Sequence, residues 1–257
     1  MDVAAAALQW GLLVMLGLGF QLAERVRPLR AHQPKRELIV DLSMLVFGPV
    51  FILGSVLLIN AAFGALPQSF ARFVEGVQAA IGGVPEPVTF VVALLLFDFA
   101  GYWVHRLQHS KALWHVHAFH HSPRHLYWLA GLRSSFVHVL LLQLGYAVAL
   151  MWLPVSPIIG LVIGVLGILN ALFIHSNVRA SLGPLGWFLV TPRSHFVHHS
   201  EDPRFGNTNY GFIFTIWDRM FGTYTDPSVL GADYALGLPY AVSTTRLWLG
   251  VPPRAAG

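Results

Sequence analysis

Eight histidines of this chain fall into three short clusters whose spacing suits one face of a helix. The first cluster is an HxxxH pair, and the other two are copies of HxxHH. Their members are His105, His109, His117, His120, His121, His195, His198 and His199. Histidine is the commonest metal ligand in proteins, and packing alone gives no reason for the repeated spacing. The pattern therefore predicts a polynuclear metal site.

The ligand types limit which metals fit. Imidazole suits zinc, copper, iron and nickel, whereas harder ions prefer carboxylates. A structural zinc site uses about four ligands, so eight histidines favour two metal ions with open positions. The chain has no cysteine, which excludes disulfides, thiolate zinc sites and iron–sulfur clusters.

Asp98 is expected to support this site. It lies seven residues before His105 and shares its helical face. Ligand histidines normally donate their second ring N–H to a carboxylate or a carbonyl. We therefore expect Asp98 to orient a ligand imidazole, directly or through Tyr102 or His138. Further candidates for such a role are Glu201, Asp202 and Asp218.

The remaining histidines are less regular. His175 follows an apolar stretch and can reach the clusters, so its role as a ninth ligand stays open. His138 either supports a ligand or bonds to a neighbouring helix. The three that are not expected to bind metal are His115, His125 and His32.

The composition is that of a membrane protein. Charged residues make up 11% of the chain, whereas soluble domains carry about 25%. A span takes about 20 apolar residues, and the stretches that qualify or nearly qualify are 4–23, 38–63, 87–104, 136–153 and 158–174. A weakly amphipathic stretch, 67–81, is expected to lie in the interface. The predicted fold is all-α, with four to five transmembrane helices and a cytoplasmic histidine-rich helical cap.

Basic residues indicate the orientation. Arg25, Arg27 and Arg30 follow the first span, whereas Arg72 is the single basic residue between the second and third spans. The positive-inside rule then places the N-terminus outside and every histidine cluster on the cytoplasmic side. The net charge of +4 is attributed to this topology, and nucleic acid is not an expected partner. We predict a multi-pass membrane protein, in the cytoplasmic membrane if bacterial.

Four motifs in a fixed order carry a family resemblance. They read Asp98-x3-Tyr102-x2-His105-Arg-x2-His109, Trp114-x2-His117-x2-His120-His121, Thr191-Pro-Arg193-x-His195-x2-His198-His199, and Asn209-Tyr210-Gly211 followed by Trp217-Asp218-Arg219-x-Phe221-Gly222-Thr223. Between residues 98 and 223 the sequence resembles the fatty acid hydroxylase/sterol desaturase superfamily of integral-membrane di-metal oxygenases.

This resemblance implies a di-iron centre that uses O2 as co-substrate, with zinc as a possible substitute in purified protein. It implies catalytic roles for Asp98, Tyr102 and Arg133, the last matching an arginine after the second cluster. Some members carry a further HxxxH before the last cluster. Its second position here is His175 but its first is Ala171, so the number of ligands stays open.

The implied reaction is hydroxylation or desaturation of a C–H bond in a lipid, such as a sterol, a fatty acyl chain or a carotenoid. A cavity between the spans would bring the lipid to the metals. The sequence has no cytochrome or flavin motif, so electrons are expected from a separate ferredoxin, cytochrome or reductase. Oligomeric state stays open.

We expect one membrane domain over residues 1–257. Its parts are N-terminal spans and an interfacial segment (1–97), a fatty acid hydroxylase-like catalytic region (98–225) and a tail (226–257). Two alternatives are a membrane haem protein and a metal transporter. Adjacent ligands such as His120 and His121 are wasteful for haem, and a transporter would place ligands near the midplane rather than at helix ends.

Overall fold

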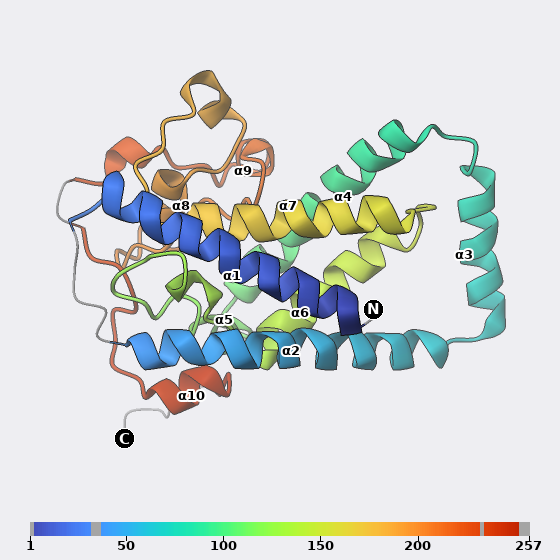
Figure 1. The fold of residues 1–257 in the computed structure, drawn as a ribbon, viewed down its shortest axis with the longest axis horizontal. Coiled ribbons are helices and arrows are strands. Elements are labelled where there is room, and N and C mark those ends of the chain that lie inside the picture. Colours follow the sequence, from blue (N-terminus) through green and yellow to red (C-terminus); the bar gives the residue numbers. More distant parts are fainter. Residues whose placement is uncertain (1–2, 32–36, 232–233, 252–257) are drawn as a thin grey trace.

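The computed structural model describes residues 3–31, 37–231 and 234–251, with the side chains of the first helix described from residue 11. Its longest helices are α1 (Val3–Val26), α2 (Leu38–Gly64), α4 (Glu86–Gln108), α6 (Phe136–Leu150) and α7 (Pro157–His175). In Figure 1, α1, α4 and α7 run from right to left, and α2 and α6 run back. The described residues contain isolated β-bridges but no strand.

Three of these helices, α2, α4 and α7, are long and apolar enough to cross a membrane. They match the predicted spans 38–63, 87–104 and 158–174 to within a few residues. The predicted span 136–153 is shorter than expected, because α6 ends at Leu150 and a turn leads to Ser156, which caps α7 by accepting from the Ile159 N–H. The chain is an all-α integral membrane protein. Membrane crossing by α1 and α6, and the orientation, stay predictions.

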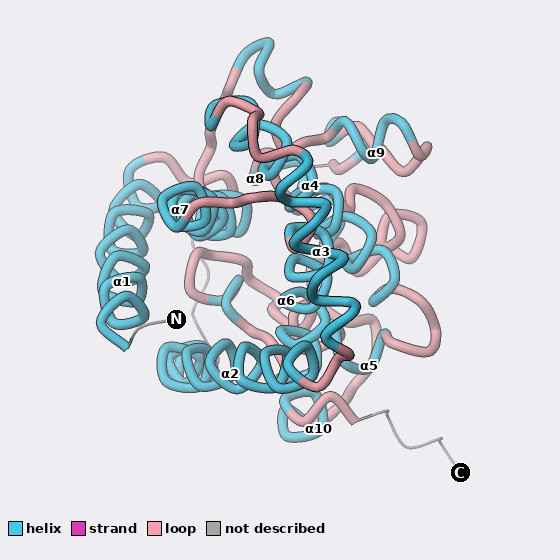
Figure 2. Tube along the Cα trace, turned by 90° about the vertical axis from the view of Figure 1, so that its right-hand side faces the viewer, coloured by secondary structure: helices cyan, strands magenta, loops and turns pink. Residues whose placement is uncertain are grey.

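The five long helices surround a cavity, which is lined by residues from each of them. Helix α1 packs on α7, whereas α2 and α4 both pack on α6, as Figure 2 shows from the end of the bundle. The α4–α6 contact is close because Gly145 has no side chain; a Cβ there would lie 2.6 Å from Val104. Small residues permit such close approach in membrane helices. Phe97 then stacks on Tyr146 with ring centroids 4.1 Å apart.

The segments that carry the histidines form a cap at the left end of the bundle in Figure 1. The short elements there are α5 (Trp114–His117), η1 (Ala130–Leu132), η2 (Gly183–Trp187), α8 (Pro192–His198), α9 (Ile216–Met220), η3 (Pro227–Val229) and α10 (Thr244–Trp248). At the opposite end lies α3 (Gln68–Ala80), which covers most of the amphipathic stretch 67–81. Its position in a membrane interface stays a prediction.

Two buried carboxylates attach the cap to the first two helices. Glu24, 1% exposed near the end of α1, accepts from the backbone N–H groups of Trp128 (2.8 Å) and Asn177 (3.0 Å). Asp41, 2% exposed in the first turn of α2, accepts from Arg133 and from the Tyr127 hydroxyl. Because a buried charge must be paired, these acids fix where the cap sits on the bundle.

Replacing Asp41 by Ala is expected to destabilise the protein by about 3 kcal/mol, because it leaves Arg133 buried with Glu37 as its remaining carboxylate partner. Thermal unfolding in detergent measures the effect. Glu86→Gln, at an exposed acid at the other end of the bundle, is the control and should unfold like the parent. An unfolding temperature for Asp41→Ala equal to that of the parent would contradict this role.

The antiparallel course predicts that the 67–86 segment and the C-terminus lie on opposite sides of the membrane. Reporter fusions inserted after Gly83 and after Gly257 should therefore give opposite signals, with the C-terminal reporter inside the cell. The same signal from both positions would remove a span from the arrangement.

Candidate metal centre

Nine histidine side chains converge in the cap as two groups of nitrogen atoms. Within each group, one nitrogen of every histidine lies within 4.8 Å of the others. The first group comprises His105, His109, His117, His121 and His198, and the second comprises His120, His175, His195 and His199. All eight clustered histidines are therefore brought together, and His175 joins them.

The two HxxHH copies contribute to both groups in opposite ways. His117 and His121 face the first group, and His120 between them faces the second. In the other copy, His195 and His199 face the second group and His198 the first. Neighbouring residues on a helix differ by about 100° in direction, so adjacent histidines diverge while those four apart stay together. Each copy thus spans both groups.

The spacing of the nitrogens fits a metal coordination sphere. In the second group, the Nε2 atom of His175 lies 3.0 Å from that of His120 and 2.9 Å from that of His195. In the first group, the Nε2 atoms of His117 and His121 are 3.1 Å apart. Two nitrogens bound about 2.0–2.1 Å from one metal at normal angles lie about 2.9–3.4 Å apart. The rings are therefore arranged as ligands are.

Five buried histidine ring nitrogens have no hydrogen-bond partner in the described part of the chain: the Nε2 atoms of His105, His109 and His198, and the Nδ1 atoms of His195 and His199. The three Nε2 atoms all belong to the first group. An unpaired buried polar atom costs about 1–3 kcal/mol, so three in one place require a partner of another kind. A metal ion would supply it, and the residues fit such an ion.

Burial, reinforced by the neighbouring imidazoles, lowers the pKa of the cap histidines well below its ordinary value. This applies to His117, His120, His121, His195, His198 and His199. These rings are therefore neutral at pH 7, which is the form that binds metal.

Backbone carbonyls orient several of the rings. A carbonyl oxygen only accepts, so each Nδ1 that contacts one carries the proton and leaves Nε2 for a metal. His105 donates to the Tyr210 carbonyl (2.9 Å) and His198 to the Thr208 carbonyl (2.8 Å). The carbonyl acceptors of His120 and His175 are those of Arg133 (3.1 Å) and Ala171 (2.7 Å). Ala171, one turn before His175, thus supports that ring through its backbone.

His138 belongs to neither group. Its Nδ1 lies 3.0 Å from the Nδ1 of His117, on the side of that ring away from the metal-facing nitrogen. Gln108 fixes this position by donating to the His138 carbonyl (3.2 Å). The Gln108 amide oxygen accepts from the same His138 Nδ1 (2.8 Å), so the N–H of His138 points to Gln108 beside the His117 ring. Neither His115 nor His125 belongs to a group, and His32 lies outside the described residues.

The prediction that Asp98 orients a ligand imidazole, directly or through Tyr102 or His138, is wrong. Its carboxylate accepts from the backbone N–H groups of Ile213 (2.6 Å) and Phe214 (3.0 Å) and from the Trp217 indole (2.9 Å). The segment 210–217 returns along α4 and occupies the space two turns below His105. Asp98 therefore acts on the loop that carries the Tyr210 carbonyl.

Asp218 holds the other end of this loop. It accepts from the N–H groups of Tyr210 (2.8 Å) and Gly211 (2.7 Å) and from the Thr223 hydroxyl (2.6 Å). Burial raises the pKa of Asp218 to about 6, so it is ionised at neutral pH. A Cβ at residue 211 would lie 2.8 Å from this carboxylate, which explains the glycine. The Asn-Tyr-Gly and Trp-Asp motifs thus build one hydrogen-bonded support for His105.

Asn209 connects this support to α8. It adopts a left-handed conformation (φ 54°), which asparagine tolerates better than most residues. Its side-chain amide donates to the carbonyls of Ser194 (3.0 Å) and Thr225 (2.9 Å). Since Ser194 precedes His195, this bond links the loop to the helix that carries the third histidine cluster.

The other two residues expected to be catalytic also support the site from outside. The Tyr102 hydroxyl lies 3.0 Å from that of Thr223 and accepts from Arg106 (3.1 Å). The Arg133 guanidinium points to Asp41 and not to the histidines. The side chains of Asp98, Tyr102 and Arg133 do not line the cavity described next, and their part in catalysis stays a prediction.

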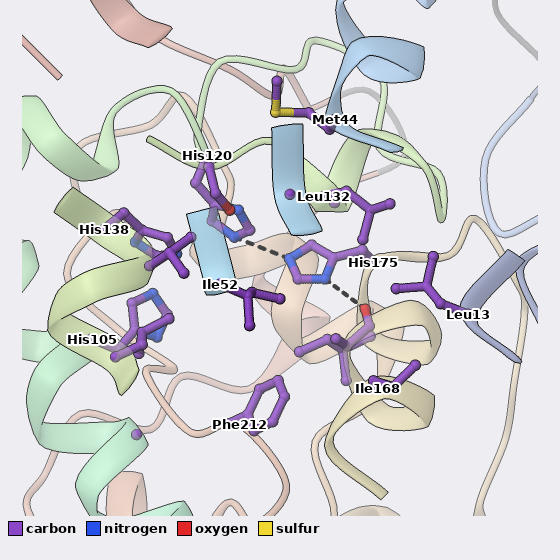
Figure 3. Close-up of a pocket in the computed structure, with 18 of the residues that line it drawn as sticks. Leu13, Met44, Ile52, His105, His120, Leu132, His138, Ile168, His175 and Phe212 are labelled. Atoms are coloured by element: carbon purple, nitrogen blue, oxygen red, sulfur yellow. Dashed lines mark hydrogen bonds between the residues drawn. The ribbon is translucent and has the colours of Figure 1, made fainter. Parts of the chain in front are cut away.

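An apolar cavity of about 440 Å³ extends between the helices to the histidines (Figure 3). Its apolar walls include Leu13 of α1, Met44 and Ile52 of α2, Leu142 of α6 and Ile168 of α7. The histidines at its end are His105, His117, His120, His138, His175 and His195. Members of both nitrogen groups therefore face one apolar space.

Anaerobically purified protein is expected to contain about two metal ions per chain, one for each group. Asp218→Leu removes the acceptor that holds the Tyr210 loop and should weaken metal binding about 10–100-fold. Elemental analysis after dialysis against a graded chelator measures this, and circular dichroism checks the helices. The matched control is Asp202→Leu, at an acid paired with the exposed Arg204. Parent-like metal retention by Asp218→Leu would refute the supporting role.

This sequence is similar to those of several known proteins. It is 35% identical over 140 residues to alkylglycerol monooxygenase from Xenopus tropicalis, which is 54% of this chain and 31% of that protein. It is 38% identical over 148 residues to ornithine lipid hydroxylase OlsE from Rhizobium tropici, 56% of this chain and 44% of that protein. Methylsterol monooxygenase 1 from Rattus norvegicus is 30% identical over 128 residues, 48% of this chain and 41% of that protein.

The chain thus spans less than half the length of these relatives. No solved structure matches it. Residues 90–223, just over half of the chain, match the family model for fatty acid hydroxylase. This match contains all nine histidines of the two nitrogen groups and both carboxylates that hold the Tyr210 loop. The chain belongs to the fatty acid hydroxylase family.

Proposed function

We propose that this protein is a membrane-bound di-iron oxygenase that hydroxylates a C–H bond of a lipid, using O2 and electrons from a separate donor. The observation that carries the proposal is the apolar cavity that ends at both nitrogen groups. Such a cavity admits a hydrocarbon chain and brings it to the place where two metals would bind.

Two groups of five and four histidines favour two metal ions over one. Imidazole alone does not separate iron from zinc, and family membership favours iron, with zinc as a substitute in purified protein. When bound, iron supplies the dioxygen chemistry that attacks an unactivated C–H bond. The histidines would hold both ions, and backbone carbonyls keep four of the rings, those of His105, His120, His175 and His198, in the correct tautomer.

The cavity contributes binding and orientation. Its apolar walls favour an alkyl chain, since each buried methylene stabilises the complex by about 0.8 kcal/mol. The same walls exclude water from the reacting carbon. His120 and His175, which face each other across the end of the cavity in Figure 3, fix how deep a chain can enter.

The printed names of the relatives favour hydroxylation over desaturation, because all three compared proteins are monooxygenases or hydroxylases. Insertion of one oxygen atom into a C–H bond leaves the other to depart as water, which requires electrons and protons from outside. A ferredoxin, cytochrome or reductase is the proposed electron source. Alkyl ether, aminolipid and sterol substrates are all consistent with an apolar cavity, and we propose that the cap faces the cytoplasm.

Neither alternative function is favoured by the geometry. The imidazoles of each group come from several segments and lie close to one another. They therefore leave no flat open space for a porphyrin. The groups also lie at the ends of α4 and α7 rather than halfway along them, which argues against a transport path for metal.

The test compares lipids from cells that express the parent, His120→Ala or His115→Ala, by untargeted mass spectrometry. The parent should produce a lipid heavier by one oxygen, and His120→Ala should abolish it, because a ligand of the second group is lost. His115→Ala is the matched control, since His115 lies five residues earlier, in α5, and outside both groups. A lipid lighter by two hydrogens would instead indicate desaturation, and equal product from His120→Ala would contradict the proposal.

A further inference from the structure

A second cavity, of about 660 Å³, lies beside the cap and is lined by three arginines. Arg30 follows α1, Arg179 follows α7 and Arg193 lies in the first turn of α8. No carboxylate occurs among its described lining residues. The cavity therefore combines a concave shape with concentrated positive charge, which suits an anion.

The arginines are carried by a rigid frame. The backbone of 27–30 pairs with that of 177–179 through an isolated bridge, Pro28 to Val178, and a 2.8 Å bond from the Arg179 N–H to the Arg27 carbonyl. Asn177 exchanges side-chain hydrogen bonds of 2.9 and 3.0 Å with the Arg30 backbone. The ends of α1 and α7 are thus joined beneath the cavity.

The three guanidinium groups are positioned differently. That of Arg30 is half-buried, donates to the Tyr234 carbonyl (2.6 Å) and lies 4.3 Å from the Tyr234 ring centroid. Those of Arg179 and Arg193 are exposed and form no ion pair at salt-bridge distance among the described residues. Asp226, next to the lining residue Pro227, caps the Ser228 N–H (2.8 Å) and is near enough to feel the charge of Arg193, but it forms no ion pair with that residue. Two of the three charges are therefore available to a ligand.

The depth of the cavity indicates where this ligand comes from. Arg30 and Arg179 lie four residues beyond the ends of α1 and α7, which is the level of lipid headgroups if these helices cross the bilayer. The segment after Ser181 exposes Leu185 (59%), Trp187 (52%) and Phe188 (52%). Exposed aromatic side chains of this kind sit at the membrane–water interface. Basic pockets between such helices bind anionic headgroups.

We propose that this cavity binds the phosphate of an anionic phospholipid in the leaflet next to the cap. The lipid joins the end of α1, the end of α7 and the start of α8. Because α8 carries His195 and α7 ends at His175, the same contacts hold two ligands of the second nitrogen group. This site is distinct from the apolar cavity and does not depend on the proposed reaction.

The test measures the thermal unfolding of the full chain in neutral detergent micelles with added phosphatidylglycerol, phosphatidylcholine or inorganic phosphate. Phosphatidylglycerol should raise the unfolding temperature of the parent more than phosphatidylcholine or free phosphate does at equal concentration. The variant Arg179→Gln/Arg193→Gln alters two exposed side chains and should fold. Each arginine lost is expected to weaken the affinity for phosphatidylglycerol about five-fold, which corresponds to about 1 kcal/mol per charge. The rise in unfolding temperature at a given lipid concentration should shrink accordingly.

Two control variants remove positive charge elsewhere. Arg124→Gln is at the same end of the bundle, in a cavity that also contains Glu37 and Asp41, and Arg72→Gln is in α3 at the other end. Both should respond to phosphatidylglycerol as the parent does. An equal response of the double variant and the parent would overturn the proposal, as would equal effects of phosphatidylglycerol and free phosphate. The double variant could instead bind phosphatidylglycerol like the parent but lose turnover driven by the electron donor. This result would also overturn the proposal and would assign the arginines to the binding of an acidic redox protein.

Discussion

A hydrogen-bond partner on the second nitrogen of an imidazole fixes the orientation of the ring toward a metal, and four rings of the cap have such a partner in a backbone carbonyl. The carbonyls of Arg133, Ala171, Thr208 and Tyr210 each receive an N–H from a ring of one of the two groups. These carbonyls come from loops and helix ends far apart in the chain. The fold must therefore position the backbone of these loops as accurately as the histidine side chains. Buried carboxylates and the side chain of Asn209 do this by hydrogen bonding to the loops.

Those carboxylates explain why polar residues persist in a largely apolar chain. Asp98 and Asp218 bind the backbone N–H groups of one loop, and Glu24 and Asp41 attach the cap to α1 and α2. Each of these acids lies where a non-helical segment packs against the helices, so that its polar groups lack the regular hydrogen bonds of a helix. In such a place an unpaired N–H is costly, so a side-chain carboxylate group that accepts from two or three donors stabilises a whole segment.

Helical spacing predicted that the three clusters meet, but not how they divide: histidines four residues apart share a group, whereas His120 and His198 each belong to the other group than the two neighbours of their own copy. The apolar stretches likewise predicted the positions of α2, α4 and α7. Spacing does not say which distant segment will cover a face. For that reason the predicted partner of Asp98 was wrong, and the roles of His175 and His138 could not be decided from the sequence. The roles of Glu24 and Asp41 were not predicted at all. An acid at the end of an apolar stretch was the available signal for these two.

The alternating division of each HxxHH copy has a consequence for metal loading. A single ion in either group orders a helical segment whose remaining histidine belongs to the other group. The conformational entropy lost in that ordering is then not lost again when the second ion binds, so the first ion raises the affinity for the second. Occupancy should rise cooperatively with free metal, and chains with a half-filled centre should be scarce at every metal concentration.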